Sequence, residues 1–201
     1  MESMGRRRSA RAFVALMGLV GLTAMLAPVP AARAAEDHWD EDRRWISARV
    51  GYARSGARLA PGGSYGYGFG YTWFLARNLA WSASVGHDLL GKYGSAAQIE
   101  VPITTEFTRH FSWSPQTRPY LGVGFGAIYY KTYRTGADIS DFRQGIYLAT
   151  GANSSLTAGS VIGLDVRWMV EQDTRSVNPT FPNPEASSTV LSAKLSVSRV
   201  F

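Results

Sequence analysis

The chain contains no cysteine among its 201 residues. This absence excludes a disulfide framework, a thiolate metal site, a cysteine nucleophile and a lipid anchor on an N-terminal cysteine. Charged residues are also scarce. They make up 18% of the chain, whereas a designed water-facing surface carries about 25–35%. The polypeptide is therefore short of the charge that a soluble shell needs.

The surplus of basic residues is confined largely to the N-terminus. Five of the 21 basic residues and one of the 15 acidic residues lie in the first 34 positions, so the remainder carries a net charge of +2. The sequence pI of about 9.8 is therefore no argument for nucleic-acid binding, and no nucleic-acid partner is expected.

No apolar run uninterrupted by proline is long enough to span a bilayer as a helix. The run over residues 12–27 has 16 residues, below the roughly 20 that a spanning helix needs. It follows a cationic segment and precedes Pro28, Pro30 and the small residues Ala32 and Ala34. This three-part pattern predicts a signal peptide over residues 1–34, cleaved before Ala35. Residues 35–44 are expected to form a solvated acidic extension on the periplasmic side.

The rest of the chain alternates with a period of two. From Tyr65 to Trp73 every odd position is aromatic and every even position is Gly or Thr, and residues 119–127 repeat this device with aliphatic side chains. Only an extended strand gathers such side chains on one face. The pattern predicts eight strands: Trp45–Arg54, Ser64–Leu75, Leu79–Leu90, Ala97–Phe111, Arg118–Thr132, Arg143–Leu156, Val161–Gln172 and Ser187–Phe201.

The predicted connectors are mostly longer at one end of the strands than at the other. An even number of such strands predicts an all-β fold, an eight-stranded antiparallel up-and-down transmembrane barrel over residues 45–201. The alternative is a soluble barrel with its aromatic faces turned inward. The interior of an eight-stranded barrel is too narrow for those faces, so they are expected to contact lipid while the Gly and Ser faces line the lumen.

Several charges fall on the lumen face, and an unpaired charge is costly in such a low-dielectric interior. The basic members are expected to pair with Glu106 and Asp165, and further with Glu100 and Glu171. The network either plugs the barrel or forms a narrow ion path, and the plug is favoured because eight strands leave little free bore. The predicted lumen charges are Arg49, Glu100, Glu106, Asp165, Arg167, Glu171 and Lys194.

Aromatic residues near the strand ends predict girdles at the membrane interfaces. Within the fourth strand, Pro102 predicts a β-bulge. Arg109 and Arg199 fall on the lipid side near the short-turn end, where a long cation reaches the interface. The predicted girdle comprises Trp45, Tyr71, Trp73, Trp81, Phe111, Trp113, Tyr129 and Trp168.

A family resemblance lies in two sequence segments, residues 118–126 (RPYLGVGFG) and 163–168 (GLDVRW), and in the terminal Phe201. Through these features the chain resembles the small outer-membrane β-barrel superfamily of OmpA-, OmpX- and OmpW-like proteins. The resemblance implies residence in the outer membrane of a Gram-negative bacterium, in contact with phospholipid and lipopolysaccharide. It also implies that Leu195, Val197 and Phe201 form the terminal signal read by the barrel-assembly machinery, although Arg199 departs from that pattern.

One fold carries many functions, so three classes stay open. The first is a non-enzymatic envelope scaffold or adhesin that acts through loops 56–63, 91–96, 133–142 and 173–186, with a host or envelope partner. The second is a narrow passage for small apolar molecules, as in OmpW-like proteins. The third is an enzyme that modifies lipid A.

The enzyme class is disfavoured by the spacing of the histidines. Lipid A deacylases use a late His and Ser, but no His follows His110. A palmitoyltransferase-like arrangement would need His87 and Asp88 together with Ser95. The three histidines, His38 included, never occur at metal-ligand spacing. No metal, cofactor or catalytic residue is therefore expected.

Overall fold

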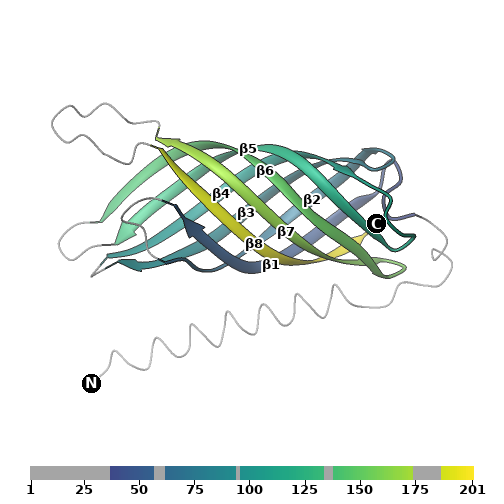
Figure 1. Ribbon diagram of the computed structural model, residues 1–201, viewed down its shortest axis with the longest axis horizontal. Helices are drawn as coiled ribbons and strands as arrows, with labels where there is room; N and C mark the ends of the chain where they lie inside the picture. The colour runs from purple at the N-terminus through teal and green to yellow at the C-terminus, as the bar shows by residue number, and fades with distance from the viewer. Residues whose placement is uncertain (1–36, 57–61, 94–95, 134–137, 174–186) are drawn as a thin grey trace, which may run out of the picture.

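The computed structural model describes residues 37–56, 62–93, 96–133, 138–173 and 187–201. These residues form eight strands (Figure 1), whose bounds are β1 Arg44–Ser55, β2 Ser64–Ala76, β3 Leu79–Tyr93, β4 Ala96–His110, β5 Thr117–Tyr133, β6 Ile139–Thr157, β7 Ser160–Asp173 and β8 Ser187–Val200. Among them there is no helix whose length and apolar character suit it to cross a membrane.

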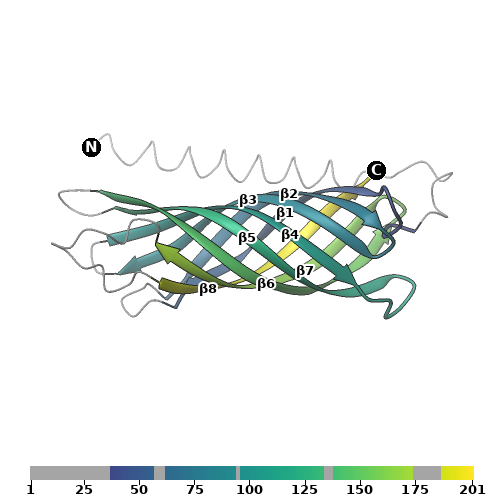
Figure 2. The same cartoon turned by 90° about the horizontal axis from the view of Figure 1, so that it is seen from above.

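The sheet closes into a barrel. Each strand pairs antiparallel with the next, and β8 pairs with β1 from Trp45↔Val200 to Ser55↔Val190. Closure leaves no strand edge unpaired. The strands run obliquely around an elongated body in both views (Figures 1 and 2). The β1–β2, β3–β4, β5–β6 and β7–β8 connections share one end, called here the loop end. The opposite end, where β1 starts and β8 finishes, is the turn end.

The eight predicted strands are confirmed, but several extend further toward the loop end. β3 continues to Tyr93, and β6 begins at Ile139. The predicted loop began at Gly91. In the structure Gly91 has a φ of 102° and the register shifts between Leu89 and Gly91. Strand pairing continues beyond this bulge to Tyr93↔Ala96. Within the predicted loops 91–96 and 133–142, residues 91–93, 96, 133 and 139–142 are therefore strand, and residues 94–95 and 134–137 lie outside the described residues. Residues 57–61 and 174–186 of the other two loops lie outside the described residues.

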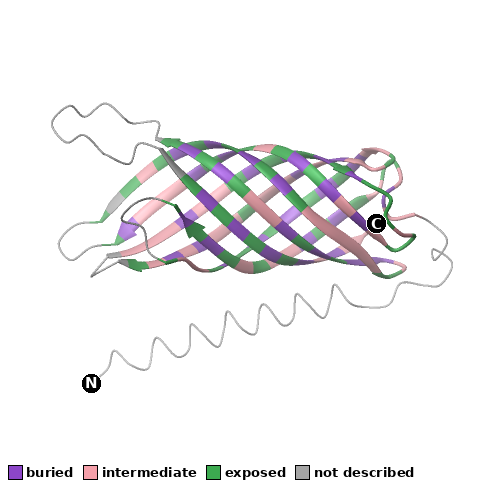
Figure 3. Ribbon diagram, in the orientation of Figure 1, coloured by how far each residue is buried: buried purple, intermediate pink, exposed green. Residues whose placement is uncertain are grey.

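Buried and exposed positions alternate along the strands, as Figure 3 shows. On β2, Tyr65 and Phe69 are 61% and 57% exposed, while the glycines between them face inward. A Cβ atom at Gly66 would lie 1.8 Å from Oδ1 of Asp88 on β3. Glycine at this position therefore makes room for a charged side chain in the lumen.

The prediction of a β-bulge at Pro102 is wrong. The β3–β4 register is the same on both sides, at Val85↔Ile103 and Asp88↔Glu100, and pairing is only interrupted between them. Pro102 has no backbone N–H to donate. A Cβ at Gly86 would lie 3.2 Å from Cγ of Pro102, so glycine opposite the ring admits it without an extra residue.

Candidate functional site: the barrel lumen

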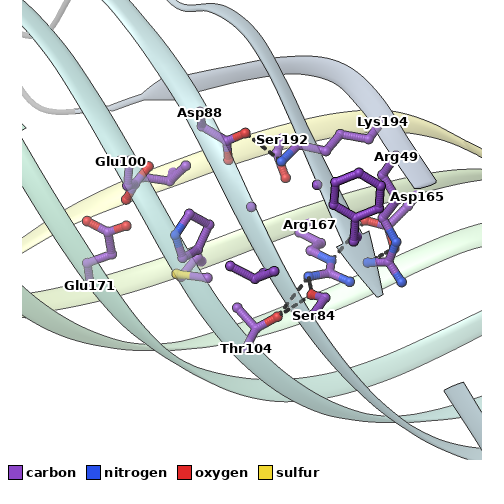
Figure 4. Close-up of a pocket in the computed structure, with 17 residues that line it drawn as sticks. Arg49, Ser84, Asp88, Glu100, Thr104, Asp165, Arg167, Glu171, Ser192 and Lys194 are labelled. Atoms are coloured by element: carbon purple, nitrogen blue, oxygen red, sulfur yellow. Dashed lines mark hydrogen bonds and ion pairs between the residues drawn. The ribbon is translucent and has the colours of Figure 1, made fainter. Parts of the chain in front are cut away.

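The lumen is lined by charged side chains. All seven predicted lumen residues point into the barrel and are largely buried; Glu100, Glu106, Asp165 and Glu171 are each at most 4% exposed. Figure 4 shows most of them around an internal cavity. Charges this far from water need partners at close range.

The central cluster joins two guanidinium groups to two carboxylates. Arg167 lies 3.1 Å from Glu106 and 2.9 Å from Asp165. Arg49 lies 4.0 Å and 3.9 Å from the same two carboxylates. The four formal charges cancel, and they come from β1, β4 and β7. The pairing expected for these four residues is therefore present in the structure.

Two tyrosines complete the central cluster. The Tyr120 hydroxyl donates to Asp165 at 2.7 Å, and the Tyr147 hydroxyl donates to Glu106 at 3.0 Å. Neither tyrosine was predicted to be a lumen residue, although each falls on the inward parity of its strand. A Cβ at Gly124 would lie 2.2 Å from the Tyr147 ring, so the glycine-rich face of β5 provides the space that this ring occupies.

A second cluster lies nearer the loop end. Lys194 is paired with Asp88 at 2.6 Å and not with the expected Glu106 or Asp165. Arg143 lies 3.4 Å from Glu171 and 4.2 Å above the Tyr130 ring. Neither Asp88, considered in the sequence only as a candidate enzyme residue, nor Arg143 was predicted to be a lumen charge, because both border predicted loops.

Glu100 stands beside Glu171 in this second cluster (Figure 4). Two carboxyl groups this close together need a nearby positive charge, and Arg143 supplies one at 3.4 Å from Glu171.

Little space is left in the bore. One cavity of about 40 Å³ lies among the charged residues of both clusters, and a second of about 30 Å³ lies toward the turn end beside His110 and Tyr120. Each holds at most a few water molecules. Among the residues that the structure describes, the charged side chains therefore leave only small spaces in the bore.

The floor of the lumen is apolar, and this corrects two predictions. Trp45 is 3% exposed and packs inside against Phe74, with ring centroids 4.9 Å apart, and not in an interface girdle. Residues 37–43, called here the N-terminal strap, cover it: Trp39 is 1% exposed and meets Trp45 edge-on at 5.9 Å. The strap is therefore not a freely solvated extension, because Trp39 is removed from water by packing against the apolar floor.

The other predicted girdle and terminal residues lie on the outer surface. Trp73 and Trp81 are register partners near the turn end, and Arg109 is exposed below them on β4. Arg199 is partly exposed on the outward face of β8. The remaining outward members are Tyr71, Phe111, Trp113, Tyr129, Trp168, Leu195, Val197 and Phe201.

The candidate enzyme residues do not meet. His87 points outward and stacks on Tyr67 with centroids 5.3 Å apart, whereas its neighbour Asp88 points inward to Lys194. Consecutive strand residues face opposite ways, so no dyad forms there; Ser95 lies outside the described residues. No group of three metal-ligating side chains occurs within the five described segments.

No known family model matches the sequence, and no curated protein matches it. Solved structures do match. Neisserial surface protein A aligns with a TM-score of 0.59 and 16% identity, over 80% of this chain and 98% of that one. The N-terminal β-barrel domain of Pseudomonas aeruginosa OprF aligns with a TM-score of 0.56 and 14% identity, over 80% of this chain and 98% of that one. Ail of Yersinia pestis aligns with a TM-score of 0.55 and 13% identity, over 80% of this chain and 99% of that one. The chain has the fold of the small eight-stranded outer-membrane barrels.

Proposed function

We propose that the protein is an integral outer-membrane scaffold with a closed lumen, which displays its loop-end connections at the cell surface. The observation that carries this proposal is the inverted distribution of side chains, with ion pairs inside and aliphatic and aromatic groups outside. Processing at Ala35, contact with phospholipid and lipopolysaccharide, and insertion by the barrel-assembly machinery belong to the same proposal.

The outer surface is suited to lipid. Val50, Ile103 and Ile146, from β1, β4 and β6, are 58–68% exposed. Burying a side chain of this size contributes about 1.5–3 kcal/mol, so a belt of them around the barrel strongly favours a hydrocarbon surrounding over water.

The interior is suited to a scaffold and not to an open pore. An ion crossing the bore would meet the apolar floor and both charge clusters. In planar bilayers the purified barrel is expected to produce no steady openings, with heat-modifiable gel migration as proof that it is folded. Regular single-channel steps from folded protein would contradict the proposal. Outer-membrane fractionation of the exported chain tests its location independently.

Specific binding is assigned to the loop end, because loops on rigid scaffolds carry recognition. Replacing residues 174–186 by a short Gly-Ser linker is expected to abolish adhesion to host cells or envelope components while leaving heat-modifiable migration unchanged. Equal adhesion by parent and variant would remove this loop as the binding element.

A second candidate function is a passage for small apolar molecules, and one observation favours it. The β3–β4 ladder is interrupted opposite Pro102, and Gly68, Gly86 and Pro102 line the adjacent 40 Å³ cavity. The interruption of the ladder therefore lies beside an internal space. If apolar molecules pass through this part of the barrel, Pro102→Val, which restores a backbone donor, should slow the uptake of an apolar dye into proteoliposomes. The control Pro119→Val should leave the uptake unchanged. Uptake no faster than into empty vesicles removes this candidate.

A further inference from the structure

The N-terminal strap is fastened to the rim of the barrel at several points. The amide of Asn78 in the β2–β3 turn donates to the carbonyl of Trp39 at 2.8 Å, and the amide of Asp42 donates to Phe74 at 2.9 Å. Nε2 of His38 bonds the carbonyl of Thr157, at the end of β6, at 3.0 Å. Seven residues therefore cross the turn end from one side of the barrel toward the other.

The buried part of the strap is Trp39. Its ring joins a small apolar cluster with Trp45, Phe74, Ala80 and Val161, the only one of its kind at the turn end among the described residues. Behind this cluster begins the 30 Å³ cavity, whose lining includes Trp45 and Thr108. The ring of Trp39 thus lies between the outside and a polar chamber.

Arg118 of β5 holds the strap from the side. Its guanidinium lies 4.6 Å over the Trp39 ring and donates hydrogen bonds to Asp37 and to the side chain of Asn78. Arg77 adds a more exposed ion pair to Asp37 at 3.4 Å. Burial alone would raise the pKa of Asp37, but the Trp39 amide and Arg118 outweigh it and hold that pKa below its usual range. The carboxylate is therefore ionised at neutral pH.

The strand ladders begin after the strap. The pairing of β1 with β2 and β8 starts at Arg44 and Trp45, although the amide of Phe74 also donates to the carbonyl of Arg43 at 2.8 Å and extends the β1–β2 pairing into the strap. Residues 37–41 can therefore detach without breaking strand pairing, and a unit held by few contacts opens at a lower free energy than the whole fold.

We infer that the N-terminal strap is a latch on the turn end of the lumen, pinned by Arg118 through Trp39 and Asp37, which controls access from the turn end to the chamber beside His110. Arg49, Glu106 and Asp165 of the central cluster line the inner side of this chamber, so the turn end is its nearer opening.

The absence of cysteine allows a direct test with single reporters. Thr108→Cys places a thiol in the chamber behind the latch, and Ser192→Cys places one beyond the central cluster. Each reporter is combined with Trp39→Ala, with the milder Asp37→Asn, or with Trp113→Ala, a control whose side chain is 81% exposed outside the strap. The rate of modification by a small charged methanethiosulfonate is measured on full-length mature protein refolded in detergent.

The expected result is a rise of about tenfold or more at Thr108→Cys with Trp39→Ala, since both ring packing and a desolvated cation–π contact are lost. Asp37→Asn gives a smaller rise, and Trp113→Ala gives none. The Ser192→Cys rate stays constant in all three. Unchanged rates at Thr108→Cys overturn the latch, and so do equal increases at both reporters, which indicate general loosening. Heat-modifiable migration checks that each variant is folded. If Trp39→Ala does not fold, the result with Asp37→Asn decides the test.

Discussion

Replacing Arg167 by Leu tests whether the central cluster holds the barrel together. Arg167 forms ion pairs of 3.1 Å and 2.9 Å with Glu106 and Asp165 and donates to Thr104 at 3.2 Å. A leucine fills part of the volume but leaves two buried carboxylates facing one remaining guanidinium, that of Arg49. The cluster then changes from neutral to a net charge of −1 inside the barrel.

The size of the effect follows from these contacts. Removing one partner of a buried ion pair costs about 3–5 kcal/mol, because the other charge stays buried without compensation. Arg49 lies only 4.0 Å and 3.9 Å from the two carboxylates and offsets part of that cost. We therefore expect Arg167→Leu to lower the free energy of unfolding by about 3 kcal/mol.

The assay is reversible urea unfolding in lipid vesicles, followed by tryptophan fluorescence and gel migration. Two variants make it specific. Arg109→Leu removes an outward-facing arginine and should cost less than about 1 kcal/mol. Adding Glu106→Gln to Arg167→Leu restores neutrality and should recover part of the lost stability. If Arg167→Leu matches the parent within about 0.5 kcal/mol, or if the added Glu106→Gln lowers stability further, the reasoning on charge balance is wrong.

Three further predictions concern packing, orientation and pH. Gly124→Ala pushes a Cβ into the Tyr147 ring and should cost about 1–3 kcal/mol in the same unfolding assay; parental stability would mean that the ring moves freely. Leu148→Arg, in the middle of β6 on the outer face, should cost about 2–4 kcal/mol in vesicles, and no loss would place that face outside lipid. Because Arg118 helps to keep the pKa of Asp37 below its ordinary value near 4, the latch contribution is complete above about pH 4 and is lost as pH falls further. The rate of thiol modification at Thr108→Cys, divided by the rate at Ser192→Cys at the same pH so that the loss of thiolate cancels, should therefore rise below pH 4 in the parent but not with Asp37→Asn.

The faces of the strands were predictable because alternation is a local property of the sequence. Once one residue such as Arg49 is assigned to the lumen, every second residue of that strand follows. Trp45 shares its parity, so alternation alone places it inside; the preference of aromatic residues for strand ends gave the wrong side. Within one strand, parity is the stronger rule, because the pleat fixes direction whereas the preference for an interface only biases it.

Partners across the lumen were not predictable in the same way. Lys194 on β8 meets Asp88 on β3 only because the sheet closes and its strands are tilted, and both are properties of the whole barrel. The packing of the N-terminal strap could not be predicted for a related reason. Residues 37–43 have no periodicity, and their charge suggested solvent exposure, but Trp39 finds a floor that exists only after Trp45 and Phe74 are brought together by closure.

The order of layers along the bore connects these findings to function. An apolar floor, a small chamber, a neutral four-charge cluster and a second charge cluster succeed one another from the turn end to the loop end. Two charge clusters stand between the chamber and the loop end, whereas the apolar floor and the seven-residue strap over it cover its other side. Any exchange with the chamber should therefore occur through the turn end.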